Sequence, residues 1–128
     1  MIIDSSAVVA ITLHEPSFDR LISLLREAAS IGVGPATLVE TGIVLQERLG
    51  PPAVETLERF ILRFGVVVVP LAEMHWPSAL DAWNRFGRGR HPARLNFGDC
   101  LAYATARLAG EPLLCTGNDF PRTDLELA

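Results

Sequence analysis

The sequence contains no lysine, because all 11 residues counted as Lys or Arg are arginine. This absence excludes enzymes that form Schiff bases, P-loop nucleotide hydrolases and phospho-receiver proteins, since each of them depends on a lysine amine. Cys100 and Cys115 are the two cysteines, and they are not spaced as a CxxC pair. We expect both to be reduced, buried and small hydrophobic residues rather than redox or zinc-binding groups.

Long hydrophobic runs are also missing. No apolar run reaches the roughly 18 residues that a membrane span requires, and the start of the chain has no basic stretch typical of a signal peptide. We therefore expect a cytoplasmic protein without membrane contact. The length of 128 residues and the hydrophobic fraction of 49% predict a single folded domain over residues 1–128. The net charge of −4 is unusual for a nucleic-acid binder, unless several acids face bound cations.

Short apolar segments alternate with longer helical patterns along the chain. This alternation predicts an α/β fold with a central, mostly parallel sheet of four to five short strands flanked by helices. The β-branched run Val66–Pro70 is typical of a central strand covered on both faces. The expected strands are 1–3, 31–34, 66–70 and 113–115, and the expected helices are 5–13, 18–29, 36–49, 53–64, 73–86 and 100–108.

The helix starts carry their own signals. Ser17 is placed to cap the helix that begins at Phe18, and either Pro35 in the first turn or Thr37 as a cap can begin the third helix. Pro77 lies early in the fifth helix and bears on where that helix begins. Asn96 and Gly98 are interpreted as loop and cap residues before the last helix.

Four acids follow strands or open helices at the same edge of the predicted sheet. Asp4 follows the first strand, Glu40 opens the helix after the second, Asp99 lies in a first helical turn, and Asp119 follows the last strand. Asp4 and Asp99 could each be simple helix caps. However, the carboxyl ends of parallel strands meet at one edge, where open α/β sheets bind ligands, so we expect the four acids to converge.

Converging carboxylates predict a metal site. Four such groups would repel one another and raise their pKa values unless a divalent cation neutralised them. Oxygen ligands suit Mg²⁺ or Mn²⁺ rather than zinc, and carboxylate clusters with such cations catalyse in-line phosphodiester hydrolysis. The loop 87–94 is either a solubilising segment or a phosphate-binding edge of this site, through Arg88, Arg90 and Arg94.

Four segments that contain these acids resemble the motifs of PIN-domain ribonucleases. They are IDSSA at 3–7, TLVE at 37–40, NFGDC at 96–100 and TGNDF at 116–120, and their order and spacing are similar to those of the VapC toxins of type II toxin–antitoxin systems. The resemblance covers essentially the whole chain. It implies a three-layer PIN fold, a Mg²⁺-dependent endoribonuclease, an RNA substrate, a cognate VapB-type antitoxin and a homodimer.

The resemblance also implies residue roles. Asp4 and Asp99 would be the principal metal ligands, Glu40 would complete the site directly or through a water, and Asp119 would be the fourth acid. Asn118 and Asp124 remain alternatives for that fourth role. Metal-activated water would cleave the phosphodiester and leave 5′-phosphate and 3′-hydroxyl ends. The expected supporting residues are Ser6, Thr116 and Asn118.

Two other classes compete with this interpretation. A non-catalytic flavodoxin-like module would bind a small ligand at the same sheet edge, but it would have no need of four acids and should not respond to Mg²⁺. A phosphatase acting on small phosphate esters would share the acids, yet it usually requires a lysine or a nucleophilic aspartate motif, and this chain has neither.

Overall fold

A parallel sheet of four short strands lies at the centre of the computed structural model, which describes all 128 residues. The strand order is β3-β2-β1-β4, and Ile2 pairs with both Gly32 and Leu113. Every neighbouring pair is parallel, so each connection crosses over through helices, as the alternating sequence pattern predicts. The strands are β1 (Ile2–Ile3), β2 (Gly32–Val33), β3 (Val67–Val68) and β4 (Leu113–Leu114).

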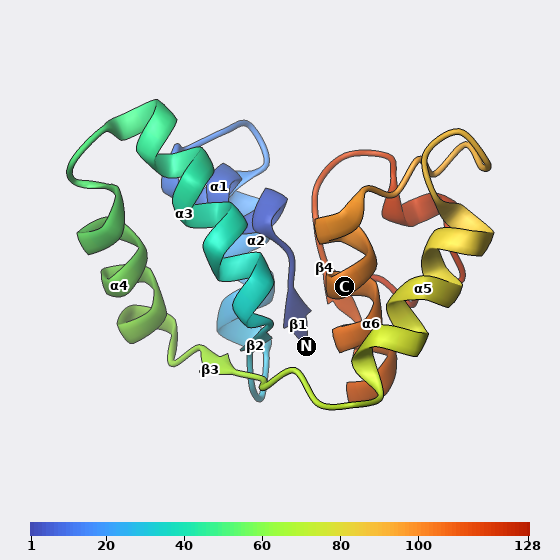
Figure 1. Ribbon diagram of the computed structural model, residues 1–128. Helices are drawn as coiled ribbons and strands as arrows, with labels where there is room; N and C mark the ends of the chain where they lie inside the picture. Colours follow the sequence, from blue (N-terminus) through green and yellow to red (C-terminus); the bar gives the residue numbers. More distant parts are fainter.

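Six α-helices surround these strands (Figure 1). Figure 1 shows the first four helices on one side of β1 and the last two on the other. None of the helices combines the length and the apolar character needed to cross a bilayer. The helices are α1 (Ser5–Thr12), α2 (Phe18–Glu27), α3 (Pro35–Leu49), α4 (Ala53–Phe64), α5 (His75–Phe86) and α6 (Phe97–Ala109), and a 3₁₀ turn, η1, spans Phe120–Arg122.

The alternation of side chains along the strands divides the interior into two cores. Ile3 and Leu114 pack with α1, α2 and α4 in one buried cluster. Ile2 and Leu113, their immediate neighbours in sequence, pack with α5 and α6 in a second cluster. Successive residues of a strand point to opposite faces, so both faces of the sheet are covered by helices. This confirms the predicted three-layer α/β architecture.

The valine-rich strand is where the prediction was wrong. Val66–Pro70 was expected to be a central, doubly covered strand, but β3 contains only Val67 and Val68 and lies at the edge of the sheet. Their side chains are 62% and 45% exposed. A β-branched run favours extended backbone wherever it lies, so it does not reveal the order of the strands.

Helix boundaries agree with the predictions to within a few residues. The predicted helix 53–64 is confirmed, whereas α5 begins at His75 instead of Glu73, and this places Pro77 in its first turn. Pro35 begins α3 with Gly34 at the cap position, so Thr37 is not a cap. Ser17 does precede α2, but its side chain makes no capping hydrogen bond. These differences leave the sheet edge and its acids in place.

Candidate active site

Asp4 lies where β1 passes into α1. Its backbone N–H donates to the Leu114 carbonyl at 2.9 Å, which continues the strand pairing with β4. Its side chain caps α1 by accepting from the Ser6 N–H at 3.0 Å. The residue is 3% exposed. The carboxylate is therefore fixed at the carboxyl edge of the sheet by both the strand and the helix.

Ser6 connects this carboxylate to the neighbouring strand. Its hydroxyl donates to Asp4 Oδ2 at 2.6 Å and accepts from the Thr116 N–H at 3.0 Å, just after β4. One hydroxyl thus links the ends of the neighbouring strands β1 and β4, and it fixes the rotamer of Asp4 relative to the 115–119 loop. Ser6 and Thr116 lie where the sequence places supporting residues.

Asp99 is held by a reciprocal cap at the start of α6. The Asn96 side chain accepts from the Asp99 N–H at 2.9 Å, and Asp99 Oδ2 accepts from the Asn96 N–H at 2.7 Å. This capping box uses one carboxylate oxygen of Asp99, which is its N3 residue, while Asn96 is the N-cap of α6. A role in helix capping and a role as a metal ligand are compatible for Asp99, because its Oδ1 takes no part in the cap.

Glu40 reaches the same place from α3, and Gly98 makes room for it. A Cβ atom placed on Gly98 would lie 2.4 Å from Glu40 Oε2, so any other residue there would displace the carboxylate. Gly98 is part of α6 and not a loop or cap residue, contrary to the prediction. Glycine inside a helix is normally unfavourable by about 0.5–1 kcal/mol. Its presence one residue before Asp99 is explained by the close approach of Glu40.

Asp119 is the fourth acid at this edge, and Asp124 lies elsewhere. Asp119 is exposed and makes no capping hydrogen bond to η1, yet its charge acts on both Asp4 and Asp99. Asp124 instead accepts from the Tyr103 hydroxyl and from Arg85, both at 2.6 Å. Of the two alternatives with carboxylates, only Asp119 is electrostatically coupled to the other acids.

The acids raise one another's pKa values. Burial raises the pKa of Asp4 most, against the hydrogen bonds from Ser6, and Asp119 raises it further. Burial also raises the pKa of Glu40, and the charges of Asp4 and Asp99 add to it. For Asp99, burial is again the largest cause of a raised pKa, with Asp4 and Asp119 contributing. Each acid is thus destabilised as an anion, as expected of a cluster without its counter-charge.

The side chains at this edge have the ligand type that a hard divalent cation prefers, but their arrangement is not yet that of a metal site. All four side chains offer carboxylate oxygens, and no histidine shares the electrostatic coupling. However, no three of the acids are arranged as a ready-made group of metal ligands. Like charges repel, and Asp4 and Asp99 each commit one oxygen to a cap. The residues therefore fit a cation that would draw the free oxygens together.

Of the three predicted arginines, one acts electrostatically on the acids. Arg88 is the one whose charge acts on Asp99, where it lowers the pKa against the effect of burial. Arg90 and Arg94 are exposed on the same loop. Asn118 is exposed and makes no side-chain hydrogen bond, so nothing in its contacts assigns it a role.

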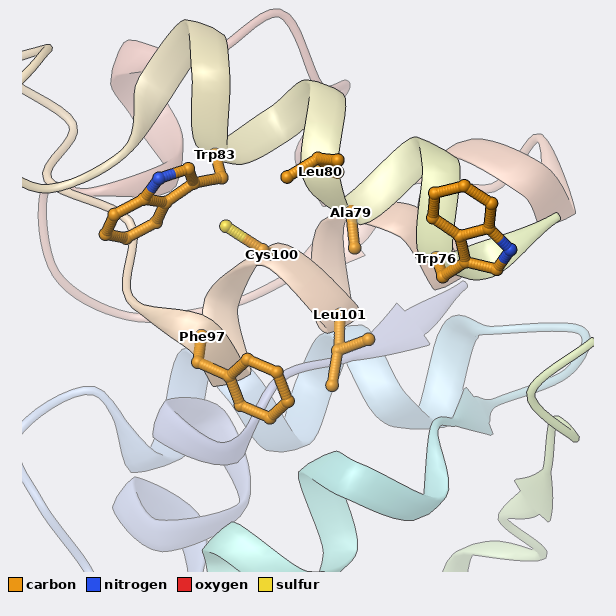
Figure 2. A pocket seen from close by; sticks show the side chains of 7 residues that line it. All are labelled: Trp76, Ala79, Leu80, Trp83, Phe97, Cys100 and Leu101. Atoms are coloured by element: carbon orange, nitrogen blue, oxygen red, sulfur yellow. The ribbon is translucent and has the colours of Figure 1, made fainter. Parts of the chain in front are cut away.

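Two cavities border the start of α6. One of about 650 Å³ lies between α3 and α6 and includes Glu40 and Gly98 in its lining. The other, of about 450 Å³, is formed by apolar side chains of α5 and α6 (Figure 2). No carboxylate lines this second cavity. Phe97 borders both cavities.

The family model of the PIN domain matches residues 1–126 of this chain. The chain belongs to the PIN-domain family. Relatives place it among the VapC ribonucleases. It is 45% identical over 127 residues to ribonuclease VapC36 of Mycobacterium tuberculosis, with 98% of this chain and 91% of the relative covered. It is 38% identical over 125 residues to ribonuclease VapC of Mycolicibacterium smegmatis, with 98% and 97% covered.

Solved structures share the fold of this PIN-domain protein. Mycobacterium tuberculosis VapC20, described as a toxin that cleaves the sarcin–ricin loop, superposes with a TM-score of 0.80 at 19% identity, covering 99% of this chain and 97% of that one. Rickettsia felis VapBC2, bound to a promoter DNA fragment, gives a TM-score of 0.78 at 15% identity, covering 99% and 96%. Membership of a ribonuclease family argues against the flavodoxin-like binding module.

Proposed function

We propose that this VapC-family protein is a Mg²⁺- or Mn²⁺-dependent endoribonuclease and the toxin of a type II toxin–antitoxin pair. The observation that carries the proposal is the gathering of acids at one sheet edge: burial raises the pKa values of Asp4, Glu40 and Asp99, and the charges of neighbouring carboxylates, Asp119 among them, raise each of these pKa values further. A bound divalent cation would neutralise such a cluster of carboxylates. Relatives named as ribonucleases and the sarcin–ricin loop toxin support RNA as the substrate.

Asp4 and Asp99 would hold the cation directly, and Glu40 and Asp119 would complete its surroundings. When bound, a divalent cation supplies positive charge that neutralises the carboxylates and stabilises the developing negative charge of phosphodiester hydrolysis. Ser6 positions Asp4 through its hydroxyl, and the capping box fixes the direction of Asp99. The protein's contribution is thus to hold the two principal ligands before substrate arrives.

We assign to Glu40 the role of taking the proton of the attacking water. Its raised pKa brings it closer to the working pH than that of an ordinary carboxylate, which favours general base catalysis. In this step the water oxygen would form a bond to phosphorus, its proton would pass to Glu40, and the bond to the 3′-oxygen would break, with the leaving oxygen taking a proton from solvent. The products carry 5′-phosphate and 3′-hydroxyl ends. Arg88, Arg90 and Arg94 would bind neighbouring phosphates. The reaction requires no 2′-hydroxyl chemistry, so the preference for RNA must come from binding.

The partners we propose are a VapB-type antitoxin and a second copy of the chain. The VapBC complex among the structural neighbours supports an antitoxin. Large exposed apolar side chains around the α5–α6 pocket support a protein contact, because exposed patches of this kind usually mark interfaces. These exposed side chains are Trp76 (65%), Leu80 (51%) and Phe97 (80%).

We also infer that residues 1–128 form one PIN domain that acts in the cytoplasm, without membrane contact.

The test is RNA cleavage by the purified protein with Mg²⁺ or Mn²⁺, followed by sequencing of the RNA ends. We expect discrete cuts with 5′-phosphate and 3′-hydroxyl ends that disappear on chelation and in Asp99→Asn. A protein that cleaves equally well with chelator, or an Asp99→Asn variant with full activity, would contradict the proposal. Size measurement by light scattering, with and without a co-expressed antitoxin, tests the two partners.

A further inference from the structure

A small surface cavity includes the 115–117 segment in its lining. Its volume is about 270 Å³, and it opens between the start of α2 and the residues that follow β4. Arg20 is its one charged lining residue, and no Asp or Glu side chain lines it. Its lining residues are Ser17, Arg20, Cys115, Thr116, Gly117, Pro121, Leu127 and Ala128.

Several hydrogen-bond donors in this cavity are not paired with an acidic side chain. Arg20 forms no ion pair with a carboxylate side chain, and its one hydrogen bond goes to the Ala128 carbonyl at 3.0 Å. The Ser17 hydroxyl makes no capping bond, although Ser17 is the N-cap of α2. The Gly117 N–H, on a residue with a φ of 84°, donates to no backbone carbonyl. A guanidinium, hydroxyls and a free N–H around one cavity are the donors that proteins use for phosphate.

The cavity is connected to the acids through one short segment. Thr116 lines it, and the Thr116 N–H donates to the same Ser6 hydroxyl that holds Asp4. Cys115 also lines it, and its side chain lies within electrostatic range of Arg20 as well as of Asp4 and Asp99. Arg20 and the acids thus both lie near the 115–116 segment, while Arg88, from the loop before α6, acts on Asp99.

We propose that the cavity lined by Ser17, Arg20, Thr116 and Gly117 binds a non-scissile phosphate of the RNA strand. This inference rests on the proposed ribonuclease function and extends it to the position of the strand. Arg20 would supply a bidentate, charge-assisted contact to the phosphate, and the hydroxyls and the N–H would complete it. The contact would fix the register of the strand without reading any base.

The test compares Arg20→Ala with Arg26→Ala, since both arginines are exposed on α2 and only Arg20 lines the cavity. With a single-stranded RNA oligonucleotide, we expect Arg20→Ala to lower kcat/KM about tenfold, mainly through KM. The slope of log K against log salt should become shallower by about 0.7, as for the loss of one phosphate contact to a single strand. Arg26→Ala should match the wild type in both measurements.

Substitution of single phosphates by neutral methylphosphonates locates the contact. One position should weaken wild-type binding about tenfold and leave Arg20→Ala unaffected, because the partner of that phosphate is already missing. Binding is measured in the Asp99→Asn background, so that cleavage does not interfere, and equal melting temperatures control for folding. Arg20→Lys should recover part of the loss, since it restores the charge but not the fork.

The outcomes separate this inference from the proposed function. A wild type that cleaves RNA while Arg20→Ala behaves like Arg26→Ala would overturn the phosphate site alone. Equal losses in both variants would also overturn it, because they would report only the overall charge of α2. A wild type that neither binds nor cleaves RNA would overturn the ribonuclease proposal, and the phosphate site with it.

Discussion

Asp124 and the sheet-edge acids face opposite electrostatic surroundings. Burial acts to raise the pKa of Asp124, but hydrogen bonds from the Tyr103 hydroxyl and Arg85 outweigh it and hold the pKa below its usual value. A third contact comes from Arg107 at 3.4 Å. The protein thus supplies all the counter-charge of Asp124, which fastens the C-terminal segment to α5 and α6.

Asp4 and Asp99 have no such counter-charge. Their nearest donors are a serine hydroxyl and backbone N–H groups, and their nearest charges are other carboxylates. Arg88 is the one cation that acts on Asp99, and its effect does not offset burial. The comparison teaches that an acid neutralised within the fold serves structure. We infer that acids whose charge the fold does not neutralise can bind a cation from solution.

The largest expected difference between the two regions is catalytic. We predict that Asp4→Asn lowers RNA cleavage by at least about 10³-fold, because it removes a charge that the cation needs in the transition state. Asp124→Asn should keep activity within a few fold, since Asp124 is not coupled to the acids. Initial rates at saturating Mg²⁺ give the comparison, with melting temperature as the control for folding. Comparable losses in the two variants would remove the distinction drawn here.

Gly98 and Gly42 offer a second, smaller contrast. A methyl group at Gly98 would meet Glu40 Oε2 at 2.4 Å, whereas at Gly42 its nearest contact is Leu57 at an ordinary 3.9 Å. We predict that Gly98→Ala lowers kcat about 10- to 100-fold through displacement of Glu40. Gly42→Ala should leave kcat unchanged and raise stability by about 0.5–1 kcal/mol, since both glycines are helical. An unaffected Gly98→Ala enzyme would show that Glu40 is not needed where it lies.

The pH dependence of stability should differ in sign between the two regions. Asp4 and Asp99 have folded-state pKa values above the ordinary 3.8, so the folded state binds more protons than the unfolded state in that window. The free energy of unfolding of the metal-free protein should therefore fall as pH rises from about 4 through the folded-state pKa values. Asp124, with its lowered pKa, contributes stability above about pH 4 that is lost as pH falls.

Denaturant titrations in chelator between about pH 3 and pH 8 measure this difference. The fall in stability on the neutral side should shrink in Asp4→Asn. The loss on the acid side should shrink in Asp124→Asn. If Asp4→Asn followed the wild-type profile throughout, Asp4 would not be an acid destabilised by its surroundings.

Much of the fold was predictable from local patterns. Helices such as 53–64 have an apolar stripe at helical spacing and end at a glycine, so their limits follow from the sequence. The order of the strands does not, because it depends on which strand each crossover reaches. The Val66–Pro70 prediction failed for this reason: the run has the composition of a buried strand, yet β3 lies at the edge of the sheet.

The site was predictable to the extent that topology determines it. Strand ends bring Asp4 and the segment before Asp119 to one edge, and the order of the elements brings Asp99 there. The choice between Asp119 and Asp124 depended on Tyr103 and Arg85, which are distant in sequence from both. Gly98 carried a signal, a glycine beside an acid at a helix start, that we misinterpreted as a cap. For Arg20 the sequence gives no signal, since only the fold brings α2 beside β4.

The central claim is that the acids at the sheet edge bind a divalent cation. The most direct test is to measure the melting temperature as Mn²⁺ is added. The wild type and Asp124→Asn should both gain stability along a saturable curve, by about 2.7 kcal/mol at a hundredfold excess over Kd. Asp4→Asn and Asp99→Asn should gain little or nothing at the same concentrations. A gain in these two variants equal to that of the wild type would place the cation elsewhere and contradict the account.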